Sequence, residues 1–170
     1  MENHAGVGTG DGGNRMTTIQ EVQQAFTTGS DAACIVRNRV EAAVPPARIR
    51  GEVARARKDF GFDHLIQISV TDLGATFQLI YHLTGPHRIV LSLAVDVPRE
   101  KPEAPSMHDI HPPAGIYERQ IHDLMGVVFT GHPNLKRIIL NEDWPQNEFP
   151  LRKDWKPEPD RYYGGVREVL

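Results

Sequence analysis

Histidine and aspartate side chains gather between positions 108 and 123, in a pattern that could bind a metal ion. His108 and His111 are three positions apart, as on one side of a helical turn, and His122 and Asp123 follow on the next expected helix, with Asp109 beside the first pair. Three histidines, or two with a carboxylate, can hold zinc or iron. The HExxH spacing that makes a metal site specific is missing. Two interpretations stay open: a small metal-dependent hydrolase using the three histidines, or capping and surface histidines, which we favour.

A second group of polar residues lies on that expected helix. Glu118 and His122 are four positions apart, as are Arg119 and Asp123. These side chains could act as a general acid and base, but we favour ion pairs that face a partner or the following segment. In particular, we expect Arg119 to form a desolvated pair with Asp123. The sequence has no nucleophile elbow and no phosphate-binding glycine motif followed by a helix.

Composition restricts the class of protein. The 170 residues and 19.0 kDa fit one domain. A net charge of -3 argues against a broad nucleic-acid interface, and a single cysteine, Cys34, excludes an internal disulfide framework and a cysteine-held metal cluster. No apolar run approaches the roughly 20 residues of a membrane helix, and the first residues do not resemble a secretory leader. We therefore expect membrane association only through a partner.

Hydrophobic periodicity predicts an α+β fold, with a small antiparallel sheet packed against helices. Helical spacing predicts helices over 17–26, 47–60 and 115–125, the last with Ile116, Ile121, Leu124 and Met125 facing a core. Alternating apolar residues predict three strands over 65–71, 77–83 and 89–97, joined by short turns as an antiparallel meander, and shorter strands over 33–40 and 127–129. We divide the chain into a disordered tail (1–15), an α+β core domain (16–129) and an extended partner-binding segment, the arm (130–170).

The arm combines many prolines with bulky apolar side chains. Proline at 133, 145, 150, 157 and 159 denies it a continuous helix or a central strand, and both tryptophans, Trp144 and Trp155, lie within it. Aromatic side chains without regular structure around them usually contact another surface. We therefore expect residues 132–163 to be held by a partner protein rather than by the core domain.

The stretch ERQIHDLMGVVFTGHPNLKRIILNEDW, followed by PLRKDW, resembles the signature of the C subunit of complex I, which is the thirty-kilodalton subunit of NADH–quinone oxidoreductase. The chain departs from that pattern at Gln120, His122 and Met125. The positions that carry the resemblance, and that it implies as a partner interface, are Glu118, Arg119, Asp123, Gly126, Gly131, His132, Pro133, Asn134, Leu135, Lys136, Arg137, Trp144, Pro150, Leu151, Arg152, Lys153, Asp154 and Trp155.

The resemblance implies a non-catalytic, structural subunit in the peripheral arm of a membrane-bound oxidoreductase that couples electron transfer to ion translocation. Such a subunit binds no cofactor itself and docks on the large subunit that lines the quinone site or carries a [NiFe] centre. Iron–sulfur clusters, and quinone or [NiFe], belong to partner subunits, and the complex lies on the cytoplasmic side of the cell membrane. Related subunits occur in group 4 energy-converting [NiFe] hydrogenases, formate hydrogenlyase and deazaflavin-oxidising enzymes, so the branch stays open, as does a free-standing adaptor.

Overall fold

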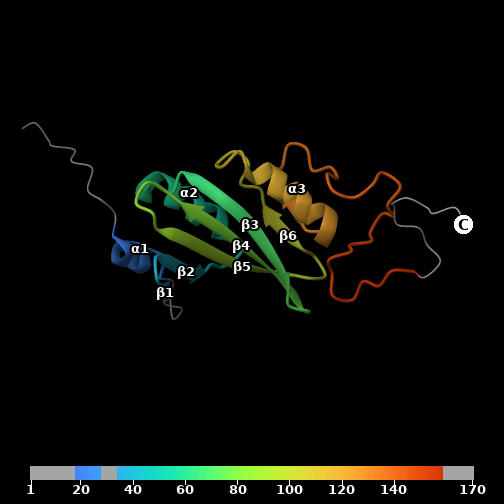
Figure 1. Ribbon diagram of the computed structural model, residues 1–170, viewed down its shortest axis with the longest axis horizontal. Coiled ribbons are helices and arrows are strands. Elements are labelled where there is room, and N and C mark those ends of the chain that lie inside the picture. Colours follow the sequence, from blue (N-terminus) through green and yellow to red (C-terminus); the bar gives the residue numbers. More distant parts are fainter. Residues whose placement is uncertain (1–17, 28–33, 159–170) are drawn as a thin grey trace, which may run out of the picture.

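A five-stranded sheet forms the centre of the molecule in the computed structural model, which describes residues 18–27 and 34–158 (Figure 1). The expected tail, 1–15, lies outside the described residues, and the division of the chain at residue 130 stays a prediction. The strand order is β1-β2-β5-β4-β3. The strands are β1 (Cys34–Val36), β2 (Arg39–Ala43), β3 (His64–Asp72), β4 (Thr76–Thr84) and β5 (Val90–Pro98).

The antiparallel meander is confirmed, but the sheet as a whole is mixed. Strand β4 pairs antiparallel with β3 and with β5, as the short turns predict, whereas β2 pairs parallel with β5. The cause is the helix between β2 and β3, which carries the chain back so that β3 starts in the direction of β2. Two reversals later, β5 runs in that direction too. The predicted strand over 33–40 is two strands, β1 and β2, joined by a tight turn.

The three predicted helices are present, and their ends follow local sequence signals. They are α1 (Ile19–Phe26), α2 (Ile49–Phe60) and α3 (Ala114–Met125). Thr18 and Glu21 form a capping box at the start of α1. Both α2 and α3 end at a left-handed glycine, Gly61 and Gly126.

The core lies between one face of the sheet and the helices. Alternate residues of β4 are fully buried, from Phe77 to Leu83, and pack in one cluster with Phe26 of α1 and Val53 of α2. On the other face His82 bridges Ser69 and Ser92, with ring nitrogens 3.0 and 2.9 Å from the two hydroxyl oxygens. This polar, half-exposed face explains the alternation along β4.

Helix α3 lies against β3 and a short two-stranded parallel sheet (Figure 1). That sheet consists of β6 (Glu103–Pro105) and β7 (Val128–Thr130), the latter close to its predicted position. The expected core face of α3 is partly wrong, because Ile116 is 60% exposed. The buried stripe is Ala114, Glu118, Ile121 and Met125, a spacing of 4, 3 and 4 residues that includes a carboxylate in place of an aliphatic side chain. Within the described ranges, no helix has the length and apolar character needed to cross a membrane.

Candidate functional site

Glu118 is the buried centre of the junction between α3 and the segment that precedes it. Its side chain is inaccessible to solvent and accepts hydrogen bonds from the Ser106 hydroxyl and the Met107 N–H, both at 2.6 Å. Burial raises the pKa of this carboxyl, against the opposing effect of the two donors. Glu118 and His122 have separate hydrogen-bond partners, since the ring Nδ1 of His122 lies 2.9 Å from the Val127 carbonyl oxygen.

Arg119 binds the arm through backbone carbonyl groups, and the expected pair with Asp123 is wrong. Its guanidinium donates to the carbonyl oxygens of Lys136 and Arg137, at 3.0 and 2.9 Å. The irregular arm has no strand or helix neighbour to satisfy these carbonyls, so side chains from α3 do so. The four-residue spacing permits the expected ion pair, but the backbone of the arm provides more partners for both side chains.

Asp123 holds three consecutive backbone N–H groups with one oxygen. Its Oδ2 accepts from Ile138, Ile139 and Leu140 at 3.1, 2.8 and 2.9 Å. The side chain is fully buried; Oδ1 has no hydrogen-bond partner among the described residues and lies 3.7 Å from Nε of Arg137. The carboxylate thus turns the chain sharply around the carboxyl end of α3.

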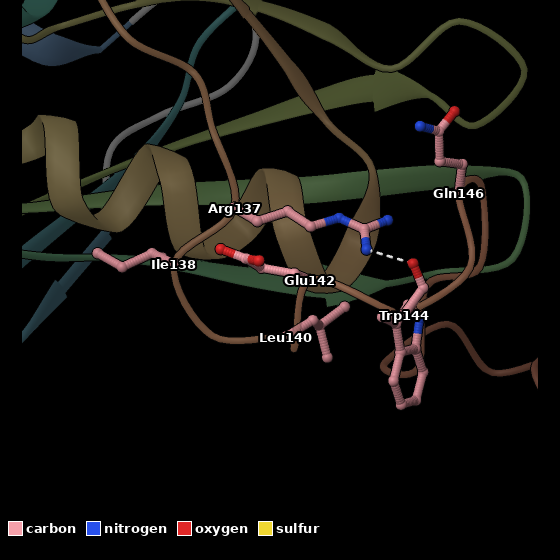
Figure 2. A pocket seen from close by; sticks show the side chains of 6 residues that line it. All are labelled: Arg137, Ile138, Leu140, Glu142, Trp144 and Gln146. Atoms are coloured by element: carbon pink, nitrogen blue, oxygen red, sulfur yellow. Dashed lines mark hydrogen bonds between the residues drawn. The ribbon is translucent and has the colours of Figure 1, made fainter. Parts of the chain in front are cut away.

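Arg137 closes the loop that begins at this turn. It donates to the carbonyl oxygen of Trp144 at 2.5 Å (Figure 2). It also donates to the carbonyl oxygen of Pro145, at 2.9 Å. The loop surrounds a cavity of about 470 Å³, lined by Arg137, Ile138, Leu140, Glu142, Trp144 and Gln146. The loop is therefore fixed at both ends by charged side chains that bond to backbone groups.

His108 and His132 pack against each other at this junction. The His132 ring packs 5.8 Å from the His108 ring, with its Nε2 3.1 Å from the Gly115 carbonyl oxygen, while its Nδ1 accepts from Asn134 at 2.9 Å. A β-carbon at Gly115 would lie 2.7 Å from His108, so glycine permits this approach. Nowhere in residues 18–27 and 34–158 do three or more histidine, cysteine, aspartate or glutamate side chains form a group that could hold a metal ion. The structure therefore does not bring His108, His111 and His122 together as the hydrolase alternative requires.

Arg152 fastens the second half of the arm to the end of α3. Its Nε donates to the Met125 carbonyl oxygen at 2.9 Å, and its guanidinium stacks over the rings of Phe149 and Phe77, at 4.3 and 5.2 Å. Next to it, Leu151 N–H donates to the Leu124 carbonyl. Burial lowers the pKa of Arg152 most, and the neighbouring Arg99 lowers it further.

Asp72, at the end of β3, ties the arm to the central sheet. Its carboxylate accepts from the Arg99 guanidinium at 2.5 Å and from the Lys153 backbone N–H at 3.0 Å. Arg99 also pairs with Asp154. Burial by itself raises the pKa of Asp72, but the hydrogen bonds from Arg99, Lys153 and Gly74 together lower it to about 2.

The remaining signature residues line or extend the same junction. Gly131 adopts a φ of 85° directly after β7, and Leu135 packs against the core. Pro133 and His132 line a second, separate pocket beside His108 and Gly115. Pro150 is half-buried, whereas Leu151 is 57% exposed. Trp144 and Trp155 face each other at 5.9 Å, and both indole N–H groups donate to Glu148.

The described part of the arm is thus bonded to its own domain, contrary to the expectation that the core does not hold it. That a partner binds residues 132–163 stays a prediction. Sequence reasoning missed the Asp72–Arg99 pair. A signal for Asp72 existed in the turn Asp-Leu-Gly, where Gly74 N–H donates to the carboxylate at 2.8 Å. Its long-range role, however, has no local signal.

Residues 42–161 match the family model for the respiratory-chain NADH dehydrogenase, 30 Kd subunit. The C subunit of NADH-quinone oxidoreductase from Moorella thermoacetica is 32% identical over 146 residues, 81% of this chain and 93% of the relative. The C subunit of F(420)H(2) dehydrogenase from Methanosarcina mazei is 38% identical over 103 residues, 59% and 65% of the two chains. This chain spans 24% of a longer relative, the C/D subunit of NADH-quinone oxidoreductase from Bacteroides thetaiotaomicron, with 37% identity.

Two solved structures share the fold. A trypsin-resistant fragment of Nqo5 superposes with a TM-score of 0.51 and 31% identity, over 57% of this chain and 83% of the fragment. A chain of a membrane-bound sulfane sulfur reductase, an archaeal respiratory membrane complex, superposes with a TM-score of 0.70 over 84% of this chain and 98% of the other. The second pair is 24% identical, so it supports the fold alone.

Proposed function

Because this chain belongs to the family of the 30 kDa subunit of respiratory-chain NADH dehydrogenase, we propose that it is a structural, non-catalytic subunit of a complex I-type oxidoreductase. It docks on the large subunit that lines the quinone site or carries a [NiFe] centre. Association with the membrane, at the cytoplasmic side, then comes through other subunits. Iron–sulfur clusters and quinone or [NiFe] belong to those partners.

One observation supports a structural role above the others. The charged signature side chains bond to backbone groups of their own chain: Glu118 to Met107, Arg119 to Lys136 and Arg137, Asp123 to residues 138–140, and Arg152 to Met125. A catalytic group must instead reach a substrate within about 3 Å. The charged side chains of the signature thus hold the backbone of the arm in place, so that the arm forms one surface.

The test is to purify the complex from native membranes through a tag on this chain. We expect the large subunit and the iron–sulfur subunits to purify with it in equal amounts. We expect the chain purified alone to show no visible absorbance band and no iron near one atom per chain. A stable chain that never purifies with redox subunits, or that carries its own iron, would reject the proposal.

A second candidate concerns the electron donor. The 38% identity over 103 residues to the F(420)H(2) dehydrogenase subunit favours a deazaflavin-dependent complex as the alternative to an NADH-dependent one, to which the longer matches point. The purified complex distinguishes the two, because NADH and reduced deazaflavin are oxidised with separate absorbance changes. Oxidation of reduced deazaflavin and not of NADH would assign the deazaflavin branch.

A further inference from the structure

The loop that Asp123 and Arg137 hold in place presents an apolar surface to solvent. The backbone N–H groups of residues 138–140 all donate to one carboxylate oxygen of Asp123. The side chains of these three residues therefore point away from that oxygen. Ile138 is 41% exposed and Ile139 is 55% exposed. The same turn that satisfies the backbone therefore displays two large aliphatic side chains.

The cavity of the loop adjoins these side chains, and its lining is half apolar (Ile138, Leu140 and Trp144) and half polar (Arg137, Glu142 and Gln146). Figure 2 shows the side chains of Leu140 and Trp144 in the lower part of the view, below Arg137, which bonds to the Trp144 carbonyl. At about 470 Å³, the cavity has room for one large side chain of a partner. We name this surface, formed by Ile138, Ile139, Leu140, Glu142 and Trp144, the loop patch.

The loop itself carries acidic side chains, and one basic side chain, Arg137, also lines the cavity. Residues 138–150 contain Glu142, Asp143 and Glu148 and no lysine or arginine. Glu142 and Asp143 are exposed, and neither has a salt bridge to another described residue. Arg137 donates to the backbone carbonyl oxygens of Trp144 and Pro145, and its charge faces the buried carboxylate of Asp123, with Nε 3.7 Å from Oδ1. The exposed charges that remain for a partner on residues 138–150 are acidic.

We propose that the loop patch is the docking site for a segment of the large subunit that carries an apolar side chain next to a lysine or arginine. The apolar side chain enters the cavity beside Leu140 and Trp144, and the basic group pairs with Glu142 or Asp143. This inference rests on the proposed function for the identity of the partner. The chemistry of the segment comes from the patch itself.

Two other occupants fit the patch less well. A second copy of this chain, related by a two-fold axis, would bring two sets of the exposed Glu142 and Asp143 together and add no exposed lysine or arginine from residues 138–150. An anionic membrane surface would meet the same acidic residues. A second copy of the chain and a lipid would each give a distinct product on crosslinking.

The experiment places the photo-crosslinking residue p-benzoylphenylalanine at Ile139 of the tagged chain, within the complete complex. The matched control carries it at Leu73, which is 50% exposed in the turn between β3 and β4. We expect position 139 to give a crosslink to the large subunit, at a segment with an apolar residue beside a lysine or arginine. A crosslink from 139 to a second copy, to lipid or to no subunit would overturn the inference.

Substitutions measure how much the loop patch contributes to binding of the large subunit. Ile138→Gln with Ile139→Gln should lower the amount of large subunit retained by roughly tenfold, and Glu142→Lys should lower it also, whereas Leu73→Gln should not. Thermal unfolding of each purified chain separates lost docking from lost folding. Full retention by the double variant overturns the inference but leaves the proposed function intact, because the wild-type chain still purifies with the complex. A wild-type chain that fails to purify with the large subunit rejects the proposed function itself.

Discussion

The carboxylate of Asp72 accepts the backbone N–H of Lys153 at 3.0 Å, across 81 residues of the chain. Asp72 ends β3, the edge strand of the sheet, and Lys153 lies near the end of the described part of the arm. Arg99 pairs with both Asp72 and Asp154, so the contact is a small network rather than a single bond. The arm, which begins at the end of β7 in the two-stranded sheet, thus reaches the edge of the five-stranded sheet.

Asp72→Ala should release the end of the arm. The substitution leaves the Arg99 guanidinium, which is 20% exposed, without its buried partner and removes the acceptor for two backbone N–H groups. We expect a loss of about 3 kcal/mol in the free energy of unfolding. Urea unfolding measures this loss, with Asp96→Ala, an exposed carboxylate on β5, as the control. Equal free energies of unfolding for the two variants would show that the network around Asp72 adds nothing to stability.

Stability should fall in acid through the same carboxyl. Asp72 has a pKa of about 2 in the folded chain against an ordinary value of 3.8. A lowered pKa stabilises the folded state fully above the ordinary value, and this contribution is lost as the pH falls from about 4 through about 2. Unfolding free energies measured over this range should decline more steeply for the wild type than for Asp72→Asn. Parallel curves would contradict the assignment.

Asp123→Ala should open the loop patch while leaving the sheet intact. Three N–H groups lose their shared acceptor, and each unsatisfied buried group costs about 1–3 kcal/mol if water cannot replace the carboxylate. We expect hydrogen exchange of residues 138–140 to rise at least tenfold, with little change in β4. Asp123→Asn retains one acceptor oxygen and serves as the matched variant, for which we expect a smaller rise. Unchanged exchange in the alanine variant would mean that another group holds the turn.

Two glycines with the same backbone conformation should differ in their response to alanine. Gly61 and Gly126 end α2 and α3 with φ of 71° and 75°. A β-carbon at Gly61 meets no atom within 4 Å, whereas at Gly126 it lies 2.5 Å from the Phe149 ring and 2.6 Å from Arg152. Gly61→Ala should cost about 1 kcal/mol from strain alone, and Gly126→Ala about 1–3 kcal/mol more from the displaced arm. Chemical unfolding compares the two, and equal losses would show that the arm adjusts freely.

Local patterns in the sequence determined much of the framework. Apolar spacing and the glycine stops predict α2 and α3 to within two residues, and alternation predicts the meander of β3, β4 and β5. The resemblance at residues 118–155 indicated the family that the match over 42–161 establishes. These features can be predicted from the sequence, because helix periodicity, strand alternation and turn residues each depend on a few neighbouring positions.

Only the tertiary structure decided what the charged signature residues do. Arg119 and Asp123 have the spacing of an ion pair, yet each bonds to the backbone of the arm. Glu118 lies in a stripe that periodicity assigns to aliphatic residues. An irregular segment satisfies few of its own polar groups, so the folded path of the arm determines which distant side chains must do so. That path is set by contacts across 81 residues, between Asp72 and Lys153, which no local period encodes.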